Sequence, residues 1–298
     1  MSKVLVTGGG GFLGGAVCHE LARRGIPMVL LARGEIAGCG RECKVVRGDL
    51  LQPAQVATAL AAEEYDTVID CAAIIPGKSR ADSSEMAEFH ANIAMTQNLL
   101  SALNGKALKS LVKVSTMDVY GFRQGDVCSR EEQLPTPSTG YGLAKYCTEL
   151  LCKDACKIMR VPLAIMRCTQ LYGPGDTSSK FIPSAIKAAR SGCEVNIYGD
   201  GADKRDYVFV NDAAQVIIGA AVECWNGVFN TATGTSTAVI DVLGMVRQIC
   251  PHPFPVRFQE RQKVSCDIQV SVARLTMMAP TFRPTPLLRG LALTYEGL

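Results

Sequence analysis

The sequence predicts an α/β protein built on a doubly wound parallel sheet, with a smaller C-terminal lobe. Short apolar segments of strand length alternate with helical patterns through the first two thirds of the 298 residues. The segments are rich in valine, leucine and isoleucine without strict polar alternation, which is typical of parallel strands buried on both faces. A glycine-rich turn follows the first of them. Together these features indicate the βαβ rhythm of a doubly wound sheet.

The expected elements follow one another in this rhythm up to about residue 170. Strands are expected at residues 3–7, 27–32, 44–48, 66–73, 110–115 and 162–168, and helices at 11–24, 52–63, 84–103 and 142–160. Beyond residue 170 the chain loosens into loops rich in glycine, proline, aspartate and serine, with helices near 181–191, 212–225 and 238–250. We therefore expect a first domain over residues 1–170 and a smaller lobe over 171–298 that interleaves with it.

Composition restricts the classes of partner. Hydrophobic residues make up 48% of the chain and charged residues 20%, as in a compact globular protein. The formal net charge of +3 is small and the cations are scattered, so we expect neither nucleic acid nor a membrane surface as a partner. No apolar stretch approaches the roughly 18 residues of a membrane span. The first strand begins at Lys3, which leaves no room for a signal peptide.

The 13 cysteines lie mostly inside apolar patterns, where a free cysteine behaves as a small hydrophobic residue. Two pairs, Cys39 with Cys43 and Cys152 with Cys156, have three residues between them but no nearby histidine. We therefore expect no metal, and a reducing, cytoplasmic compartment.

Residues 7–14, TGGGGFLG, link the first strand to the first helix. Gly8, Gly11 and Gly14 allow a tight turn, close approach to a pyrophosphate and packing of the helix on the sheet, while the amides at Phe12 and Leu13 open the helix. The strand, turn and helix in this order predict a dinucleotide-binding Rossmann domain over residues 1–170.

The end of the second strand favours NADP(H) over NAD(H), although NAD(H) stays possible. Ala32 stands where an NAD-type site places a carboxylate, and the Arg33 guanidinium suits a 2′-phosphate. The alternative is a solvated arginine at a loop start. At the end of the third strand, Asp49 is expected to accept from the adenine amino group beside Leu50. Its alternative role is that of N-cap for the next helix.

A tyrosine and a lysine four residues apart, Tyr141 and Lys145, share one helix face. An ammonium about 4 Å from the phenol would lower the pKa of Tyr141 enough for acid/base work. The end of the fifth strand supplies a hydroxyl for the reacting oxygen, from Thr116 or, as second choice, Ser115.

These residues together resemble the extended short-chain dehydrogenase/reductase family, in its nucleotide-sugar epimerase, dehydratase and reductase branch. The resemblance also covers Cys71 to Ala73, Asn92, residues 167–176, 180–183 and 205–214. It implies that Thr116, Tyr141 and Lys145 are catalytic, that Lys145 and Ala72 contact the cofactor, and that the substrate is a nucleotide sugar. The implied substrate contacts are Ser115, Gln170, Phe181, Ile182, Pro183 and Arg205, with Gln170 where the family usually has asparagine. Arg205 would bind the diphosphate, unless it forms a surface ion pair with Asp206.

The dehydratases of this branch carry an Asp-Glu pair after the catalytic threonine, whereas this chain has Met117 and Asp118. Dehydration is therefore disfavoured. The short length and Arg33 resemble the 4-keto reductases, so we expect reduction of a nucleoside-diphosphate 4-keto-6-deoxyhexose at C4. The alternative is a 4-epimerase similar to the UDP-glucose epimerases. A non-catalytic NADP-binding sensor is a remote alternative, because such a protein would be expected to lose Tyr141 and Lys145.

The resemblance also implies a homodimer through the helices at 84–103 and 142–160. Leu143, Cys147, Leu150 and Leu151 allow this interface, and core packing would explain them equally well.

Overall fold

The computed structural model describes residues 3–36, 40–75, 84–121, 128–261 and 267–297, which form two compact units. Residues 3–121, 133–168 and 214–229 belong to the first unit. Residues 128–132, 169–213 and 230–297 belong to the second. The chain therefore returns to the first unit after it has entered the second.

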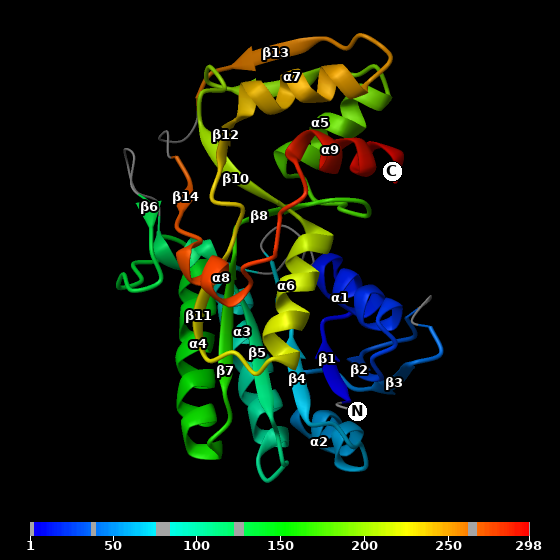
Figure 1. Ribbon diagram of the computed structural model, residues 1–298, viewed down its shortest axis with the longest axis vertical. Coiled ribbons are helices and arrows are strands. Elements are labelled where there is room, and N and C mark those ends of the chain that lie inside the picture. The colour runs from blue at the N-terminus through cyan, green and yellow to red at the C-terminus, as the bar shows by residue number, and fades with distance from the viewer. Residues whose placement is uncertain (1–2, 37–39, 76–83, 122–127, 262–266, 298) are drawn as a thin grey trace. The chain divides into compact units, whose positions relative to one another are not determined.

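A seven-stranded sheet forms the centre of the first unit, in the order β11-β7-β5-β4-β1-β2-β3 (Figure 1). Its strands are β1 (Val4–Thr7), β2 (Met28–Ala32), β3 (Cys43–Arg47), β4 (Thr67–Asp70), β5 (Ser110–Thr116), β7 (Leu163–Cys168) and β11 (Gly227–Thr231). Neighbouring strands from β3 to β7 run parallel. Their carboxyl ends therefore meet at one edge, where open α/β sheets bind ligands.

Helices pack on this sheet, whose central strands such as β1 and β2 are apolar and buried. They are α1 (Phe12–Arg23), α2 (Pro53–Ala61), α3 (Glu85–Leu103), α4 (Gly140–Met159) and α6 (Val210–Val222), with a 3₁₀ helix η1 (Met117–Tyr120) after β5. The core between α2, α3, α4 and the sheet contains Leu5, Val68, Leu99 and Leu111, all at most 1% exposed. Burial of such side chains stabilises each by about 1.5–3 kcal/mol before the entropy cost is subtracted.

Among its described residues, the second unit contains three small sheets and four complete helices. Its strands are β8 (Gln170–Tyr172), β10 (Lys204–Phe209) and β12 (Ser236–Ala238) in one sheet, β9 (Val195–Tyr198) with β13 (Val256–Gln259), and β6 (Cys128–Ser129) with β14 (Gln269–Val270). The helices are α5 (Phe181–Arg190), α7 (Val239–Ile249), α8 (Ala273–Met278) and α9 (Leu287–Glu296). A second core, which includes Tyr172, Ile186, Phe209 and Leu243, holds these elements together.

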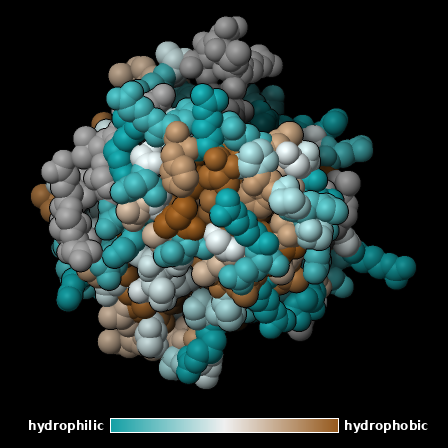
Figure 2. All heavy atoms as spheres, turned by 90° about the horizontal axis from the view of Figure 1, so that it is seen from above, coloured by the Kyte–Doolittle hydropathy of each residue, from teal (hydrophilic) through white to brown (hydrophobic). Residues whose placement is uncertain are grey.

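The predicted α/β fold is confirmed, and each of the six expected strands lies in the large sheet. The seventh strand, β11, was not predicted from its sequence GVFNT. On the face shown in Figure 2, hydrophilic side chains surround a small hydrophobic patch. Within the described residues, no helix has the length and apolar character to cross a bilayer.

Candidate active site

The glycine turn between β1 and α1 has the geometry that a dinucleotide needs. Gly8 has φ 71°, and the amide of Gly11 donates to its carbonyl oxygen at 2.9 Å. A Cβ on Gly8 would lie 2.7 Å from the backbone nitrogen of Ala72, and a Cβ on Gly14 would overlap the Gly8 carbonyl oxygen. No side chain caps the helix at Gly11, and its first turn, which begins at Phe12 and Leu13, holds no acidic residue. The helix end is thus suited to a pyrophosphate.

The residues expected to set cofactor preference follow β2 and β3. Arg33 comes directly after β2 and is exposed, and no ion pair involves it among the described residues. Asp49 accepts a hydrogen bond from the amide of Leu51 at 3.0 Å through Oδ1. The N-cap of α2 is Gln52, so the alternative role of Asp49 as that cap is wrong. Leu50 is buried in the core.

The hydroxyl expected from the end of β5 is that of Thr116. Its Oγ1 accepts from the amide of Asp118 at 3.2 Å and caps η1. Ser115, expected as a substrate contact, lies on the opposite face of β5 from Thr116, because alternate residues of a strand face opposite sides. Its hydroxyl donates to Glu149 Oε1 at 2.6 Å and is buried in the core.

Tyr141 lies in the first turn of α4, where the Thr139 hydroxyl accepts from the amide of Gly142 at 3.0 Å. A Cβ on Gly142 would lie 2.6 Å from the carbonyl oxygen of Asp118, so this turn packs closely on η1. The structure thereby brings Tyr141 next to the segment that follows Thr116.

Lys145 and Tyr141, expected to work as a pair, both lie in surroundings that shift their pKa values. Lys145 is buried, and its Nζ donates to the carbonyl oxygen of Val114 at 2.6 Å. Burial, followed by the charge of Asp118, raises the pKa of Tyr141 above its ordinary value. Burial, followed by the nearby Lys113 ammonium, lowers the pKa of Lys145 to about 8. In the protein alone, Tyr141 therefore holds its proton at neutral pH.

The expected substrate residues of the second unit lie at two places. Gln170 is partly buried and pairs in register with Tyr207 between β8 and β10. Phe181 begins α5 and is partly buried, whereas Ile182 and Pro183 are buried in the core of this unit. The side chains of Ile182 and Pro183 therefore support α5 and do not form an open surface.

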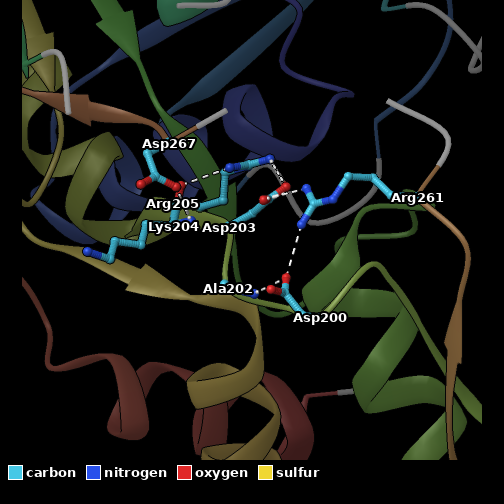
Figure 3. Close-up of polar contacts among 7 residues, drawn as sticks. All are labelled: Asp200, Ala202, Asp203, Lys204, Arg205, Arg261 and Asp267. Atoms are coloured by element: carbon cyan, nitrogen blue, oxygen red, sulfur yellow. Dashed lines mark hydrogen bonds and ion pairs between the residues drawn. The ribbon is translucent and has the colours of Figure 1, made fainter. Parts of the chain in front are cut away.

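Arg205 lies in a charged cluster at the start of β10 (Figure 3). Its Nη2 is 3.4 Å from Asp203 Oδ2, and its Nη1 donates to the carbonyl oxygen of Lys204 at 2.8 Å. The alternative of an ion pair with Asp206 is wrong. Asp206 is fully buried, and it accepts from the amides of Thr233 and Gly234 at 2.9 and 2.8 Å.

A second arginine in this cluster, Arg261, was missed from the sequence. Its Nη1 donates to Asp203 Oδ1 at 2.6 Å, and its Nη2 donates to Asp200 Oδ1 at 3.0 Å. The two arginines therefore bind opposite oxygens of one carboxylate, as Figure 3 shows. Arg205 and Arg261 are distant in the sequence. They meet because β13, which precedes Arg261, pairs with β9.

The described residues contain no group of three or more metal-ligand side chains that could hold an ion. Cys152 and Cys156 are buried and free, and burial raises the pKa of both thiols, to about 12 and about 11. Cys39 lies outside the described residues.

Comparison with known proteins decides the family. A model of the NAD dependent epimerase/dehydratase family matches residues 4–231. The chain belongs to this family. It is 27% identical to a dTDP-4-dehydro-6-deoxy-D-allose reductase of Streptomyces sp, over 97% of this chain and 93% of the relative. It is 28% identical to a UDP-glucose 4-epimerase of Rhizobium leguminosarum bv. trifolii, over 87% and 86%. The crystal structure of the Thermus thermophilus UDP-glucose 4-epimerase in complex with NAD matches 99% of this chain and 98% of that chain, at 25% identity and a TM-score of 0.86.

Proposed function

We propose that this member of the family is an NADP(H)-dependent oxidoreductase that reduces a nucleoside-diphosphate 4-keto-6-deoxyhexose at C4. The observation that carries the proposal is the arrangement at the carboxyl edge of the first unit's sheet. There, Thr116 ends β5, and Tyr141 lies in the first turn of α4, which packs against the segment that follows Thr116. The similarity to the dTDP-sugar reductase over nearly the whole chain supports the same substrate class.

The residues of the first unit fit a nicotinamide dinucleotide. The turn at Gly8 and the uncapped start of α1 would bind its pyrophosphate, and Asp49 and Ala72 border the ends of β3 and β4. When bound, the cofactor supplies the hydride that C4 receives. Arg33 is exposed and offers a cation to a 2′-phosphate, and Ala32 offers no competing carboxylate, so we propose a preference for NADPH.

Thr116 and Tyr141 have separate tasks in this proposal. The Thr116 hydroxyl holds the C4 oxygen, and the Tyr141 phenol gives its proton to that oxygen as negative charge develops. The raised pKa of Tyr141 keeps the phenol protonated, which suits the donor required for reduction. Oxidation of a C4 hydroxyl, the first step of epimerisation, is the reverse of this step and would begin with Tyr141 without its proton.

Arg205 and Arg261 are proposed to bind the substrate diphosphate. Both guanidinium groups are partly buried and form ion pairs with Asp203, which fixes their orientation. Planar guanidinium groups suit phosphate because they donate two parallel hydrogen bonds. A homodimer through α3 and α4 is also proposed, since Leu143 and Leu150 of α4 are 44% and 46% exposed in the single chain. Core packing does not account for these two leucines.

The similarity to UDP-glucose 4-epimerases supports a second candidate, epimerisation at C4. The two candidates differ in stoichiometry. We would supply NADPH with either a dTDP-linked 4-keto-6-deoxyhexose or UDP-glucose, and follow absorbance at the NADPH band together with product identity. The proposal predicts one NADPH oxidised per C4-reduced product. Formation of an epimer without cofactor consumption would overturn it in favour of the epimerase.

A further inference from the structure

A buried polar row crosses three adjacent strands below the carboxyl edge of the sheet. Thr7, Asp70 and Lys113 are register partners on β1, β4 and β5. Thr7 Oγ1 donates to Asp70 Oδ1 at 2.5 Å, and Lys113 Nζ donates to Asp70 Oδ2 at 2.6 Å. Lys113 also donates to the Thr96 hydroxyl of α3 at 3.0 Å. Asp70 and Lys113 are 2% and 1% exposed, so the row is a fully buried ion pair.

Such a pair is not explained by stability. Removing two charges from water costs several kcal/mol per ion, which their attraction only partly repays, and an apolar pair of similar volume is often at least as stable. The neighbouring strand positions are valine, leucine and isoleucine, which would pack well here. The retained charges therefore need another reason.

The row lies close to Lys145 of α4, which the resemblance assigns to catalysis together with Tyr141 of the same helix. The Lys145 ammonium donates to the carbonyl oxygen of Val114, the residue that follows Lys113. Lys113 points from β5 toward α3, and Ser115, two residues on and thus on the same sheet face, donates to Glu149 of α4. Both bonds place this face of β5 under α3 and α4.

A second buried ion pair joins α4 to β7. Glu149, one helical turn beyond Lys145, accepts from Arg167 Nε and Nη2 at 3.0 and 2.7 Å, and both side chains are at most 2% exposed. The Arg167 guanidinium lies 4.8 Å from the centre of the Tyr120 ring. Lys145 is therefore positioned among two buried ion pairs, each joining neighbouring elements of the core.

We propose that the Asp70–Lys113 pair has a charge-setting role for Lys145, which means that it controls whether Lys145 carries a positive charge. The Lys113 ammonium repels a positive charge on Lys145, and the Asp70 carboxylate partly offsets this repulsion. The pair would thus decide the pH at which Lys145 holds its proton in the working enzyme. This inference rests on the proposed role of Tyr141 and Lys145 in hydride chemistry.

The charges that act on each group agree with this assignment. After burial, Lys113 is the largest influence lowering the pKa of Lys145, whereas Asp70, Glu149 and the Cys152 thiol act in the opposite direction. Burial opposes both charges of the pair, yet Lys113 holds the pKa of Asp70 below its ordinary value and Asp70 raises that of Lys113. The pair therefore stays charged while Lys145 titrates. Directly after β4, the Cys71 thiol also interacts electrostatically with Lys113 and Lys145, and burial raises its pKa.

The proposal makes the two single variants move in opposite directions. Lys113→Met removes the opposing ammonium and leaves Asp70, so the pKa of Lys145 should rise by about one pH unit. Asp70→Asn leaves Lys113 uncompensated, so the pKa of Lys145 should fall, by about half a unit because Asp70 has the smaller influence. If the pair had a purely structural role, both variants would instead lose stability, and the pKa of Lys145 would not shift in either.

The measurement is a pH titration of the Lys145 ¹³Cε signal in the protein without cofactor, assigned by its absence in Lys145→Met, alongside the pH profile of turnover. Lys109→Met is the matched control. Lys109 joins Asp66 at 2.6 Å on the surface, just before β5 and β4. This control should leave the Lys145 titration unchanged. Single-variant shifts of the same sign, or no shift in either, would overturn the proposal.

An unfolded single variant does not leave the question open. The double variant Asp70→Asn/Lys113→Met carries no uncompensated charge, and its Lys145 titration should move up by about half a unit because Lys113 has the larger influence. A midpoint at or below that of the wild type would contradict the proposal. If the wild type turns over no sugar nucleotide but the ¹³Cε shifts have the expected signs, the proposed function fails and the charge-setting role stands.

Discussion

Lys145→Met should reveal a cost that the folded protein carries at neutral pH. The pKa of Lys145 falls from an ordinary 10.5 to about 8, with burial as the largest cause. Between these values the unfolded chain binds a proton that the folded protein does not, so stability rises with pH. The cost is fully present below pH 8 and disappears as the pH rises through 10.5. Methionine has a similar length and no charge, so it removes this dependence.

The size of the effect follows from the shift. At about 1.4 kcal/mol per pH unit, the cost at pH 7 is about 3 kcal/mol, and most of it is lost by pH 10. The variant also leaves the Val114 carbonyl oxygen without its lysine donor, which costs about 1–3 kcal/mol at every pH. Only the change with pH is therefore diagnostic.

Urea unfolding of the wild type and the variant without cofactor, at pH 7, 8, 9 and 10, measures this change. The free energy of unfolding of the variant, relative to the wild type, should fall by about 2–3 kcal/mol from pH 7 to pH 10. Lys109→Met serves as control, because Asp66 raises the pKa of Lys109 and no trend is expected below pH 10. A difference between Lys145→Met and wild type that does not change with pH would refute the reasoning.

Three further predictions concern cofactor preference, the proton donor and the packing of the glycine turn. Titration should give tighter binding of NADPH than of NADH, weakened by Arg33→Ala and partly reversed by Ala32→Asp; equal affinities would contradict the assignment. Tyr141→Phe should reduce turnover by about 10² or more with little change in cofactor affinity, and Thr116→Val should also reduce turnover. Near-normal turnover in Tyr141→Phe would show that Tyr141 is not the proton donor. Gly14→Ala should lower the free energy of unfolding by about 2 kcal/mol or more, because its Cβ would overlap the Gly8 carbonyl oxygen; an unchanged denaturation midpoint would argue against that close packing.

The sheet of the first unit was predictable because several of its strands, such as β1 and β2, are continuous apolar runs that are buried on both faces. The edge strand β11 was not, since Gly227–Thr231 begins with glycine and ends with two polar residues. Its residue Asn230 is buried through contacts distant in sequence, including the Glu131 side chain, which accepts from its amide at 2.9 Å. Local pattern carries no information about such partners.

The candidate site divides in the same way. Gly8, Thr116 and Tyr141 were predictable because each follows or begins a recognisable element. The ion pair of Asp70 with Lys113 was not, because a charge within an apolar strand has no visible partner in the sequence. The spacing of Tyr141 and Lys145 placed both on α4 but did not reveal that Lys145 binds the Val114 carbonyl oxygen. The protonation of these side chains depends on partners from neighbouring strands. Those partners can be identified only when the strand order and register of the sheet are known.

Transfer of deuterium tests the central claim most directly. NADPH carrying deuterium at the transferred position of C4 of the nicotinamide would be supplied with a dTDP-linked 4-keto-6-deoxyhexose, and the product analysed by mass spectrometry and NMR. The account predicts one deuterium per product molecule, located at C4 of the sugar, and loss of this transfer in Tyr141→Phe. A product that contains no deuterium at C4, or deuterium at another carbon, would contradict it.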